Sequence, residues 1–368
     1  MHLVCNGKDL ATAVSAVTKV VNSHSTVALL HNVLLSAHDS TLHIRATDLS
    51  TSLERVIPVE VREGGAATVP GKLFATYLAN ASNHLLEISA TPTRLSIRSG
   101  DGAKYDFNAL PAEDYPPLPE HAITSEIELD GELLRRAIRA VTFAAARDEA
   151  RGPLIGTRFS LSEAGLSLAA TDGYVLATWE GGPRFPGVVA WNVIVPTSAL
   201  DEAARNIDTQ ATIRVSRLGA NHNWIRFTGD ALNVTTRTLD GQYPKTDTLF
   251  PPNFEAQITV GKTLLRQALK RAELVCDDRS PKVLFAASDG KLTLSANSER
   301  FGTAFEQVTT QHDGDDFSIS LNATYIGAVI DRIVGDEVSL RHSGALRPML
   351  VTGGGDGIEA KYLVMPIR

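Results

Sequence analysis

Cysteine is scarce in this sequence, and long apolar runs are absent. The 368 residues contain only two cysteines, Cys5 and Cys276. This excludes a disulfide framework and favours a reducing, cytoplasmic location with both thiols buried. No apolar run approaches the ~20 residues that a membrane helix needs, and residues 1–8 lack the layout of a secretory signal peptide. We therefore expect a soluble cytoplasmic protein that does not bind a membrane.

The signatures of the common enzyme classes are also missing. Gly261-Lys262-Thr263 resembles the end of a P-loop, but Ala256 stands where that loop needs a glycine, so no phosphate cradle is expected. The ten histidines show no metal-ligand spacing. There is no Gly-x-Ser-x-Gly elbow, and the acidic residues form no compact cluster for a two-metal site. We expect no catalytic residue, no metal and no cofactor.

What the sequence contains instead is a threefold repeat of about 125 residues, which is the size of a small domain. An amphipathic helical stretch opens each third, beginning at Leu10, Leu133 and Leu264. A marker that precedes a second helical stretch recurs in each copy, at Val69-Pro70, Val195-Pro196 and Ser320-Leu321. Another marker, earlier in each copy, recurs at Thr47-Asp48, Thr171-Asp172 and Ala296-Asn297. The chain is expected to be three tandem copies of one fold.

Each third reads as helix, strands, helix, strands. Period-two alternation at residues 41–46, 165–170 and 291–296 predicts half-buried antiparallel strands. Turns are expected at Asp172-Gly173, Asp240-Gly241 and Asp289-Gly290. Proline-dense segments at residues 110–119 and 240–252 predict extended, semi-rigid linkers. The fold class is therefore α+β, with domains at residues 1–121, 122–251 and 252–368.

Periodicity also assigns the apolar face of each opening helix. The first face is Leu10, Val14, Val17 and Val21; the second is Leu133, Leu134, Ala137, Ile138 and Val141; the third is Leu264, Leu265, Ala268, Leu269 and Ala272. The opposite faces of the second and third helices are basic. They carry Arg135, Arg136 and Arg139 in the second, and Lys262, Arg266, Lys270 and Arg271 in the third.

The basic residues align between the two copies, Arg135 with Arg266 and Arg139 with Lys270, in a protein whose formal net charge is −7. Registered cations of this kind indicate an anionic partner, although a solvated helix face is the alternative. The first copy has Thr12 and Ala16 at these positions. Without a recognition-helix motif, such cations suit phosphate contact, so DNA binding would be independent of sequence and sensitive to salt.

Four segments identify a family resemblance: residues 147–154, 170–177, 109–116 and 362–368 are similar to segments of bacterial sliding clamps, the β subunits of DNA polymerase III. The similarity runs through the whole chain in order. It implies a clamp fold that closes into a ring as a head-to-tail homodimer, with helices lining the bore around double-stranded DNA. The implied partners are the DNA polymerase III α subunit, the clamp loader and other clamp-motif proteins. The implied role is a non-catalytic processivity factor.

The resemblance also implies three sets of site residues. The DNA-binding set is His24, Lys72, Arg135, Arg136, Arg139, Arg151, Lys262, Arg266 and Lys270. The peptide-binding pocket, between the second and third domains, is Leu154, Thr171, Gly173, Tyr174, Val175, Leu176, Pro244, Thr248, Leu249, Asn322, Tyr325, Leu346, Leu363, Met365, Pro366, Ile367 and Arg368. The dimer interface is Lys104, Tyr105, Phe107, Leu274, Val275, Phe301 and Phe305.

The sequence departs from the family pattern at some of these positions. His24 stands where the family has an arginine, and Val175 and Thr248 where relatives often carry one. Residues 299–306 are less acidic than the family's dimer strand, and residues 104–107 are partly aromatic, so we expect an unusually apolar interface that Phe107→Asp would split. An alternative function is a divergent second clamp copy with altered partner or inhibitor binding. A nuclease or transferase is disfavoured because no site for one is apparent.

Overall fold

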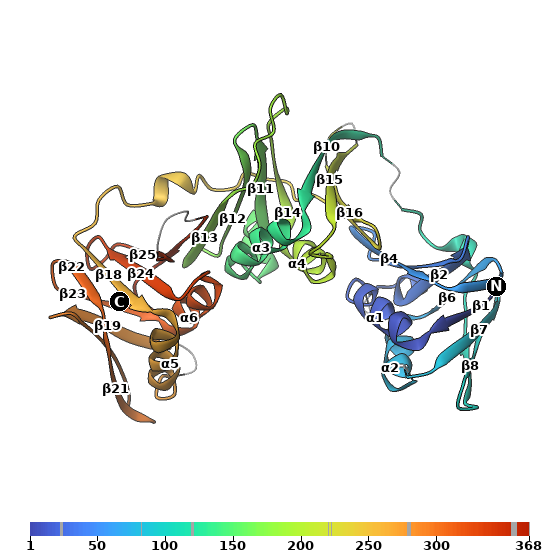
Figure 1. Cartoon of the computed structure of the whole chain (residues 1–368), viewed down its shortest axis with the longest axis horizontal. Coiled ribbons are helices and arrows are strands. Elements are labelled where there is room, and N and C mark those ends of the chain that lie inside the picture. Colours follow the sequence, from blue (N-terminus) through green and yellow to red (C-terminus); the bar gives the residue numbers. More distant parts are fainter. Residues whose placement is uncertain are drawn as a thin grey trace. The chain divides into compact units, whose positions relative to one another are not determined.

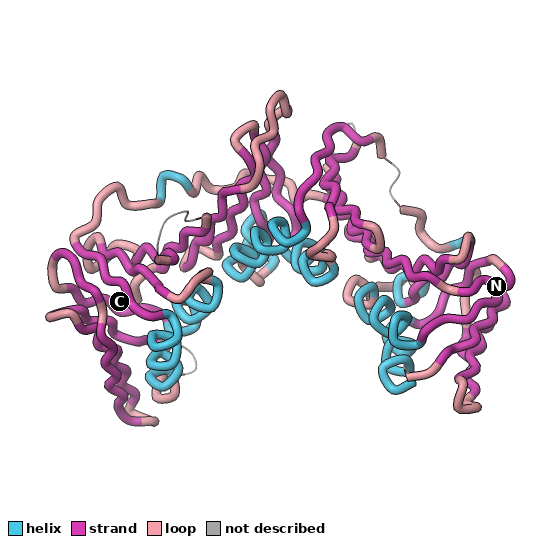
Figure 2. Tube along the Cα trace, in the orientation of Figure 1, coloured by secondary structure: helices cyan, strands magenta, loops and turns pink. Residues whose placement is uncertain are grey.

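The computed structural model describes residues 1–22, 25–81, 83–118, 121–219, 221, 223–277, 281–354 and 359–367. Each third of the chain has two α-helices among the described residues (Figures 1 and 2). They are α1 (Gly7–Val17) and α2 (Gly71–Ala81) in the first third, α3 (Gly131–Val141) and α4 (Thr197–Asn206) in the second, and α5 (Lys262–Glu273) and α6 (Ala323–Arg332) in the last. None of the described helices is long and apolar enough to cross a bilayer.

Each copy contains one strand before its first helix, four or five strands between its helices and three strands after its second helix. The first copy has β1 (His2–Asn6), β2 (Asn32–His38), β3 (Thr41–Thr47), β4 (Thr51–Pro58), β5 (Glu60–Glu63), β6 (Gly65–Pro70), β7 (Leu85–Thr91), β8 (Arg94–Ser99) and β9 (Lys104–Asn108). The second has β10 (Ile123–Asp130), β11 (Gly156–Ser162), β12 (Gly165–Thr171), β13 (Val175–Gly181), β14 (Trp191–Pro196), β15 (Thr212–Leu218), β16 (Trp224–Gly229) and β17 (Leu232–Arg237). The third has β18 (Ala256–Gly261), β19 (Lys282–Ser288), β20 (Lys291–Ser298), β21 (Gly302–Thr309), β22 (Gln311–Gly314), β23 (Phe317–Asn322), β24 (Glu337–His342), β25 (Met349–Gly353) and β26 (Ala360–Val364).

The strand pairing repeats with the element order, and all of these ladders are antiparallel. The strand before the first helix pairs with the strand after the second helix, as β1·β7, β10·β15 and β18·β24. The strand after the first helix pairs with the strand before the second, as β2·β6, β11·β14 and β19·β23. The predicted α+β fold, three tandem copies of a two-helix unit with antiparallel sheets, is confirmed.

Two further ladders join neighbouring copies, β4 to β17 and β13 to β26. They create an eight-stranded sheet, β10-β15-β16-β17-β4-β3-β2-β6, and a nine-stranded sheet, β14-β11-β12-β13-β26-β25-β24-β18-β22. Because the middle copy supplies strands to both, the chain divides into two compact units that cut through that copy. Unit 1 is residues 1–135 with 198–238, and unit 2 is residues 136–197 with 239–368. The domain limits at 121 and 251 remain a prediction.

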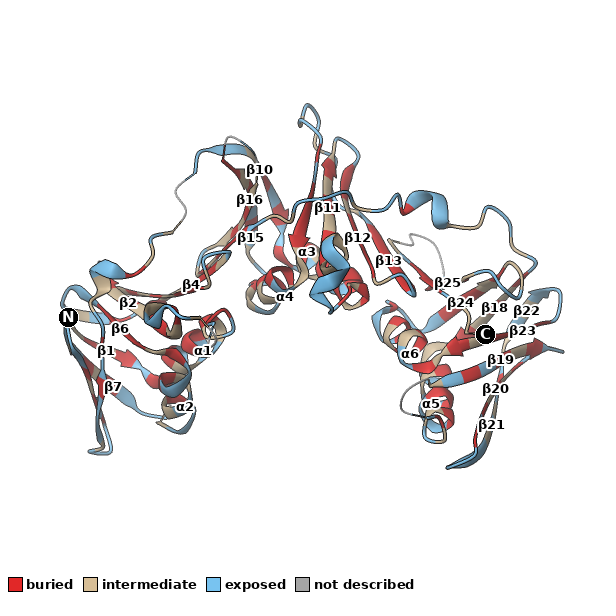
Figure 3. Cartoon of the chain, turned by 180° about the vertical axis from the view of Figure 1, so that it is seen from behind, coloured by how far each residue is buried: buried red, intermediate tan, exposed pale blue. Residues whose placement is uncertain are grey.

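Within each unit, helices cover a sheet with their apolar faces. In unit 1, α1 packs on β3, β4 and α2, around the buried side chains of Leu10, Val14 and Phe74. In unit 2, α5 packs on β20, β21 and α6, around Leu265 and Phe285. Figure 3 shows buried residues concentrated in the strands and on one side of the helices, and exposed residues in the loops.

Side-chain caps fix where several helices begin. Asn6 Oδ1 accepts a hydrogen bond of 2.9 Å from the backbone N–H of Lys8 at the start of α1. Asp130 Oδ1 accepts one of 2.8 Å from Leu133 N at the start of α3. These residues satisfy N–H groups that have no partner inside the helix, which stabilises each helix by about 1 kcal/mol.

The alignment of the copies differs from the sequence prediction by one residue in three places. The buried face of α1 matches Leu10 with Leu134 and Leu265, whereas Leu264 is exposed and Leu133 half-buried. Ala11 and Ser15, and not Thr12 and Ala16, therefore occupy the positions of Arg135 and Arg139. In the third copy, the strand before α6 ends at Leu321-Asn322, and Asn297-Ser298 matches Thr47-Asp48. Doubled leucines and repeated small polar residues concealed these shifts.

The connections also differ in part from the prediction. The two proline-dense linkers each contain a short 3-10 helix, Ala112–Asp114 and Asp247–Leu249, so neither is extended throughout. The φ angle that proline imposes is compatible with such a turn. Asp172-Gly173 and Asp289-Gly290 lie in hairpins as expected, but Asp240-Gly241 lies in the connection beyond β17. Both cysteines are free and buried, and burial raises the pKa of Cys5 to about 12.

Candidate functional site

The basic faces of α3 and α5 contain arginines that are already paired with carboxylates. Arg135, the fifth residue of α3, approaches Glu132 with Nη2 2.6 Å from Oε2. Arg266, the fifth residue of α5, binds Asp331 of α6 with two hydrogen bonds, Nε to Oδ1 at 2.8 Å and Nη2 to Oδ2 at 3.0 Å. The hydrogen bond from Arg266 lowers the pKa of Asp331, so its carboxylate is charged at neutral pH.

One turn further along each helix, the matching cation is exposed. Arg139 and Lys270 are the ninth residues of α3 and α5, and neither side chain has an ion-pair partner among the described residues. Each of these helices therefore presents one neutralised cation and one open cation at the same two positions. An open cation can contact a phosphate at once, whereas a paired one must first leave its carboxylate.

The other predicted DNA-binding residues differ in whether their side chains are bonded within the protein or exposed. Lys262 Nζ donates to the carbonyl of Ile333 across 2.5 Å, and Arg136 pairs with Glu359 at 3.0 Å. Lys72, near the start of α2, and Arg151, in the 3-10 helix Glu149–Ile155, are exposed. His24 lies outside the described residues. Sequence reasoning missed the acidic partners Glu132, Glu359 and Asp331, two of which are distant in sequence from the arginines they bind.

Unit 2 brings together most of the predicted peptide-binding residues around the turn between β12 and β13. Asp172 Oδ1 accepts hydrogen bonds from Tyr174 N at 2.8 Å and Val175 N at 2.9 Å. Thr171 Oγ1 donates to Val175 O at 2.7 Å and accepts from Gly173 N at 3.0 Å. Gly173 has a φ of 92°, which glycine adopts without strain. The turn is thus held by two side chains and one glycine.

Helix α6 fixes this turn from one side. Asn322 caps the helix by accepting from Thr324 N and Tyr325 N. The Tyr325 hydroxyl donates to Asp172 Oδ2 across 2.7 Å, and its ring stacks on that of Tyr174 at 6.3 Å between centroids. Burial and this hydrogen bond together raise the pKa of Tyr325 to about 12, so the hydroxyl remains a donor at neutral pH.

The C-terminal strand forms the other side of the site. Val175 and Leu176 lie opposite Val364 and Leu363 in the β13·β26 ladder. The buried cluster Leu176, Leu350 and Leu363 extends to two aromatic residues that sequence reasoning missed, Phe250 and Phe254. Beyond the strand, Met365 N donates to Tyr174 O across 2.9 Å. Met365, just beyond β26, is therefore attached directly to the turn.

The predicted pocket residues fall into three classes of burial. Gly173, Tyr174, Pro244, Thr248, Leu249, Leu346 and Met365 are exposed; Leu154, Asn322, Tyr325, Pro366 and Ile367 are half-buried; and Thr171, Val175, Leu176 and Leu363 are buried. Arg368 lies outside the described residues. The buried members belong to the core, so only the first two classes offer side-chain surface to a partner.

The first copy contains a turn built like the one in the second. Asp48 Oδ1 accepts from Ser50 N at 2.8 Å and Thr51 N at 2.6 Å. Thr47 Oγ1 donates to Thr51 O at 3.0 Å and accepts from Leu49 N at 3.1 Å. Leu49 therefore occupies the position of Gly173, with a φ of 76° that is costly for a leucine. The repeated Thr-Asp pair in the sequence was the signal for this shared turn.

Four of the predicted dimer residues lie on strands that are sheet edges: Lys104, Tyr105 and Phe107 on β9 of unit 1, and Phe305 on β21 of unit 2. Phe301 lies just before β21, and Leu274 and Val275 follow the end of α5. Tyr105 and Phe305 are exposed, at 50% and 71% of their surfaces. Phe301 and Leu274 are also exposed, as is Lys104, while Val275 is half-buried.

Phe107 differs from the expectation that it lies on the interface surface. It is only 7% exposed and packs edge-on against Phe74 and Tyr77, with ring centroids at 5.6 and 5.5 Å. A cavity of about 440 Å³ lies beside it, lined by Tyr77 and Tyr105 among others. Phe107→Asp would bury a charge in the core, so it is not a clean test of dimer contact.

Sequence profiles of one family match along the whole chain. They describe the N-terminal, central and C-terminal domains of the DNA polymerase III beta subunit, at residues 1–119, 128–245 and 247–368. The beta sliding clamp of Streptomyces coelicolor is 30% identical, over 98% of this chain and 97% of that protein. The beta sliding clamp of Bacillus subtilis is 26% identical over 98% and 97%.

Solved structures agree with the sequence comparisons. The sliding clamp of Pseudomonas aeruginosa, bound to griselimycin, superposes with a TM-score of 0.91 at 26% identity, over 100% of this chain and 99% of that one. The sliding clamp of Bacillus subtilis gives a TM-score of 0.90 at 26% identity with the same coverage. The chain therefore belongs to the DNA polymerase III beta subunit family and is a DNA sliding clamp, a processivity factor of the polymerase holoenzyme that is not itself catalytic.

Proposed function

We propose that two copies of this chain close head to tail into a cytoplasmic ring around double-stranded DNA, with clamp domains at residues 1–121, 122–251 and 252–368. One observation carries the proposal: among the described strands, two have a free edge at the place where the repeat forms a ladder between neighbouring copies. The third strand after the first helix of one copy pairs with the last strand of the next copy, as β4·β17 and β13·β26. The strands left over are β21 and β9, which are both sheet edges.

The two observed ladders also supply a register for the third. Leu53 lies opposite Val234 in β4·β17, and Ala177 lies opposite Tyr362 in β13·β26. The three copies are aligned at the starts of their first helices, and the strand ladders are followed from there residue by residue. In this alignment Ala304 corresponds to Leu53 and Ala177, and Tyr105 corresponds to Val234 and Tyr362. This pairing places the core-facing sides of both strands together. It would also close two exposed edges, which otherwise invite aggregation.

The same proposal assigns the basic helix faces to the DNA. Arg139 and Lys270, which are open and registered, support direct phosphate contact, and exposed Lys72 and Arg151 add positive charge. His24, Arg135, Arg136, Lys262 and Arg266 complete the proposed set. Contacts of this kind are independent of base sequence and weaken as salt rises.

We further propose that the turn at residues 171–175 receives a short peptide from the DNA polymerase III α subunit, the clamp loader and other clamp-motif proteins. Tyr174, Leu249, Leu346 and Met365 expose apolar surface in this part of unit 2. Apolar anchors supply most of the energy in peptide recognition. The hydrogen bonds of Asp172 and Tyr325 hold the turn in shape before a peptide arrives, which lowers the entropic cost of binding.

A cysteine pair tests ring closure at the proposed register. A chain carrying Ala304→Cys and Tyr105→Cys should form covalent dimers on mild oxidation, because facing strand residues lie within disulfide reach. The matched control carries Ala304→Cys and Asp106→Cys, one residue out of register and on the opposite face. Native Cys5 and Cys276 are buried and should not interfere. Equal cross-linking of both chains, or none in either, would contradict the proposed pairing.

A further inference from the structure

We propose that Glu132 and Asp331 act as built-in counterions that limit how strongly the ring holds DNA, and so keep it mobile. This inference rests on the proposed function, because it requires α3 and α5 to face the duplex. It concerns how the DNA contact is tuned, which the family assignment does not specify.

The three copies provide an internal comparison. The fifth residue of the first helix is Arg135 in the second copy, Arg266 in the third and Ala11 in the first. Both arginines are paired with a carboxylate in their own chain, Glu132 and Asp331 respectively. The copy without the arginine provides the reference case.

The two carboxylates come from different places in the fold. In the second copy the acid is the second residue of the first helix, Glu132, and the third copy has Thr263 at that position. In the third copy the acid is the ninth residue of the second helix, Asp331, and the second copy has Arg205 there. Acidic residues at two different positions of the repeat therefore have the same effect, which is to pair with the arginine.

The first copy fits the same rule. With Ala11 in place of the arginine, it has Lys8 at the position of Glu132 and Ala79 at the position of Asp331. An acid is present where the arginine is present and absent where it is absent. This correlation across three copies indicates that the carboxylate is matched to the cation.

The geometry of the third copy shows how the matching works. Arg266 donates hydrogen bonds to both carboxylate oxygens of Asp331, at 2.8 and 3.0 Å. The positive charges of Lys270 and Arg332 also act on Asp331. A DNA phosphate that binds Arg266 must displace this carboxylate. Each such arginine therefore contributes less to counterion release than an open cation does.

A closed ring has little need for the phosphate contacts that the carboxylates weaken. Closure keeps the protein on DNA, so strong phosphate binding would add friction and no retention. The open cations Arg139 and Lys270 leave a weak attraction that centres the duplex. The paired arginines hold additional positive charge that is cancelled within the protein.

The experiment measures one-dimensional diffusion of loaded rings on long DNA, and the salt dependence of binding to a short linear duplex. Asp331→Asn and Glu132→Gln should each slow diffusion several-fold. Each should also steepen the slope of log affinity against log salt by roughly 2, since a ring of two chains frees two arginines. The double variant Arg266→Gln with Asp331→Asn also removes the cation that Asp331→Asn exposes, so it should diffuse faster than Asp331→Asn alone and lose the added salt slope.

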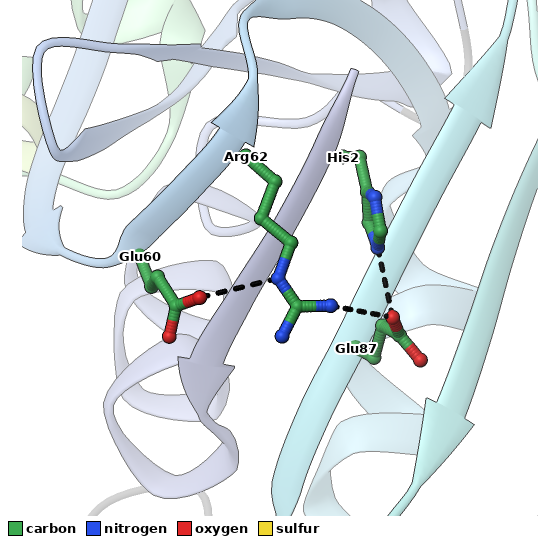
Figure 4. Close-up of polar contacts among 4 residues, drawn as sticks. All are labelled: His2, Glu60, Arg62 and Glu87. Atoms are coloured by element: carbon green, nitrogen blue, oxygen red, sulfur yellow. Dashed lines mark hydrogen bonds and ion pairs between the residues drawn. The ribbon is translucent and has the colours of Figure 1, made fainter.

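The matched control is Glu60→Gln, which makes the same change in net charge away from the helices. Glu60 pairs with Arg62 of β5 at 3.1 Å, in a cluster where Arg62 and His2 also contact Glu87 (Figure 4). This variant should diffuse like the wild type. Melting temperatures of all variants show whether each has folded, and the double variant supplies a second test that does not leave an arginine unpaired.

Two results would overturn the inference and are distinguishable. Wild-type rings that stay on circular DNA, combined with unchanged diffusion and salt slope in Asp331→Asn and Glu132→Gln, would overturn the counterion role alone. Wild-type protein that does not stay on circular DNA would overturn the proposed function, and the counterion role with it.

Discussion

The hydroxyl of Tyr325 donates a hydrogen bond to Oδ2 of Asp172 across 2.7 Å. The other oxygen of Asp172 accepts the backbone N–H groups of Tyr174 and Val175. One carboxylate therefore joins α6 to the turn between β12 and β13. Tyr325 is a positioning residue for this turn, and its effect on a bound peptide is exerted through Asp172.

Tyr325→Phe should weaken binding of a clamp-motif peptide by at least about tenfold, because a hydrogen bond to a charged group contributes roughly 1.5–3 kcal/mol. Fluorescence anisotropy with a labelled peptide measures this affinity. Tyr77→Phe is the matched control, because Tyr77 belongs to unit 1 and its hydroxyl has no hydrogen-bond partner among the described residues. Equal affinities for wild type and Tyr325→Phe would show that the turn holds its shape without this bond.

The same hydroxyl predicts a pH dependence. Its pKa is raised to about 12, above the value of about 10 expected in the unfolded chain. The stability that the neutral hydroxyl supplies is fully present below pH ~10 and is lost as pH rises toward about 12. Urea unfolding should show a constant difference between wild type and Tyr325→Phe up to pH ~10, shrinking above it. A difference that vanishes below pH ~9 would contradict the assignment.

The shared turn predicts that glycine is the more stable residue at the same position in both copies. Leu49→Gly should stabilise the protein by roughly 0.5–1 kcal/mol, because Leu49 has a φ of 76° and its side chain is 57% exposed. Gly173→Ala should destabilise by about 1 kcal/mol through φ alone, since a Cβ there would meet nothing within 4 Å. Urea unfolding measures both, and loss of stability in Leu49→Gly would refute the shared conformation.

Phe305→Lys should yield folded monomers, because Phe305 is 71% exposed on the edge strand β21 and the proposed register places it opposite Lys104, where a second lysine is repelled. Light scattering should show half the wild-type mass with an almost unchanged melting temperature. Phe107→Asp should instead lower stability by at least ~3–5 kcal/mol, since its ring is packed in the core. A dimeric mass for Phe305→Lys would remove β21 from the interface.

The fold was predictable because it depends on local patterns that recur three times. Helical spacing located the buried faces, and alternation located the strands. The pairing of Arg266 with Asp331 was not predictable, because the two residues lie on different helices and are brought together only by α5–α6 packing. The burial of Phe107 was missed for a related reason. Alternation places Tyr105 and Phe107 on one face, but only Phe107 is covered by Phe74.

The most direct test of the account is the fate of the loaded protein when circular DNA is cut. The protein is loaded on nicked circular DNA with a clamp loader and separated from free protein, and the DNA is then linearised. A closed ring should remain on the circle and slide off the ends after linearisation. Retention on the linear product would contradict a topological clamp and indicate ordinary phosphate binding.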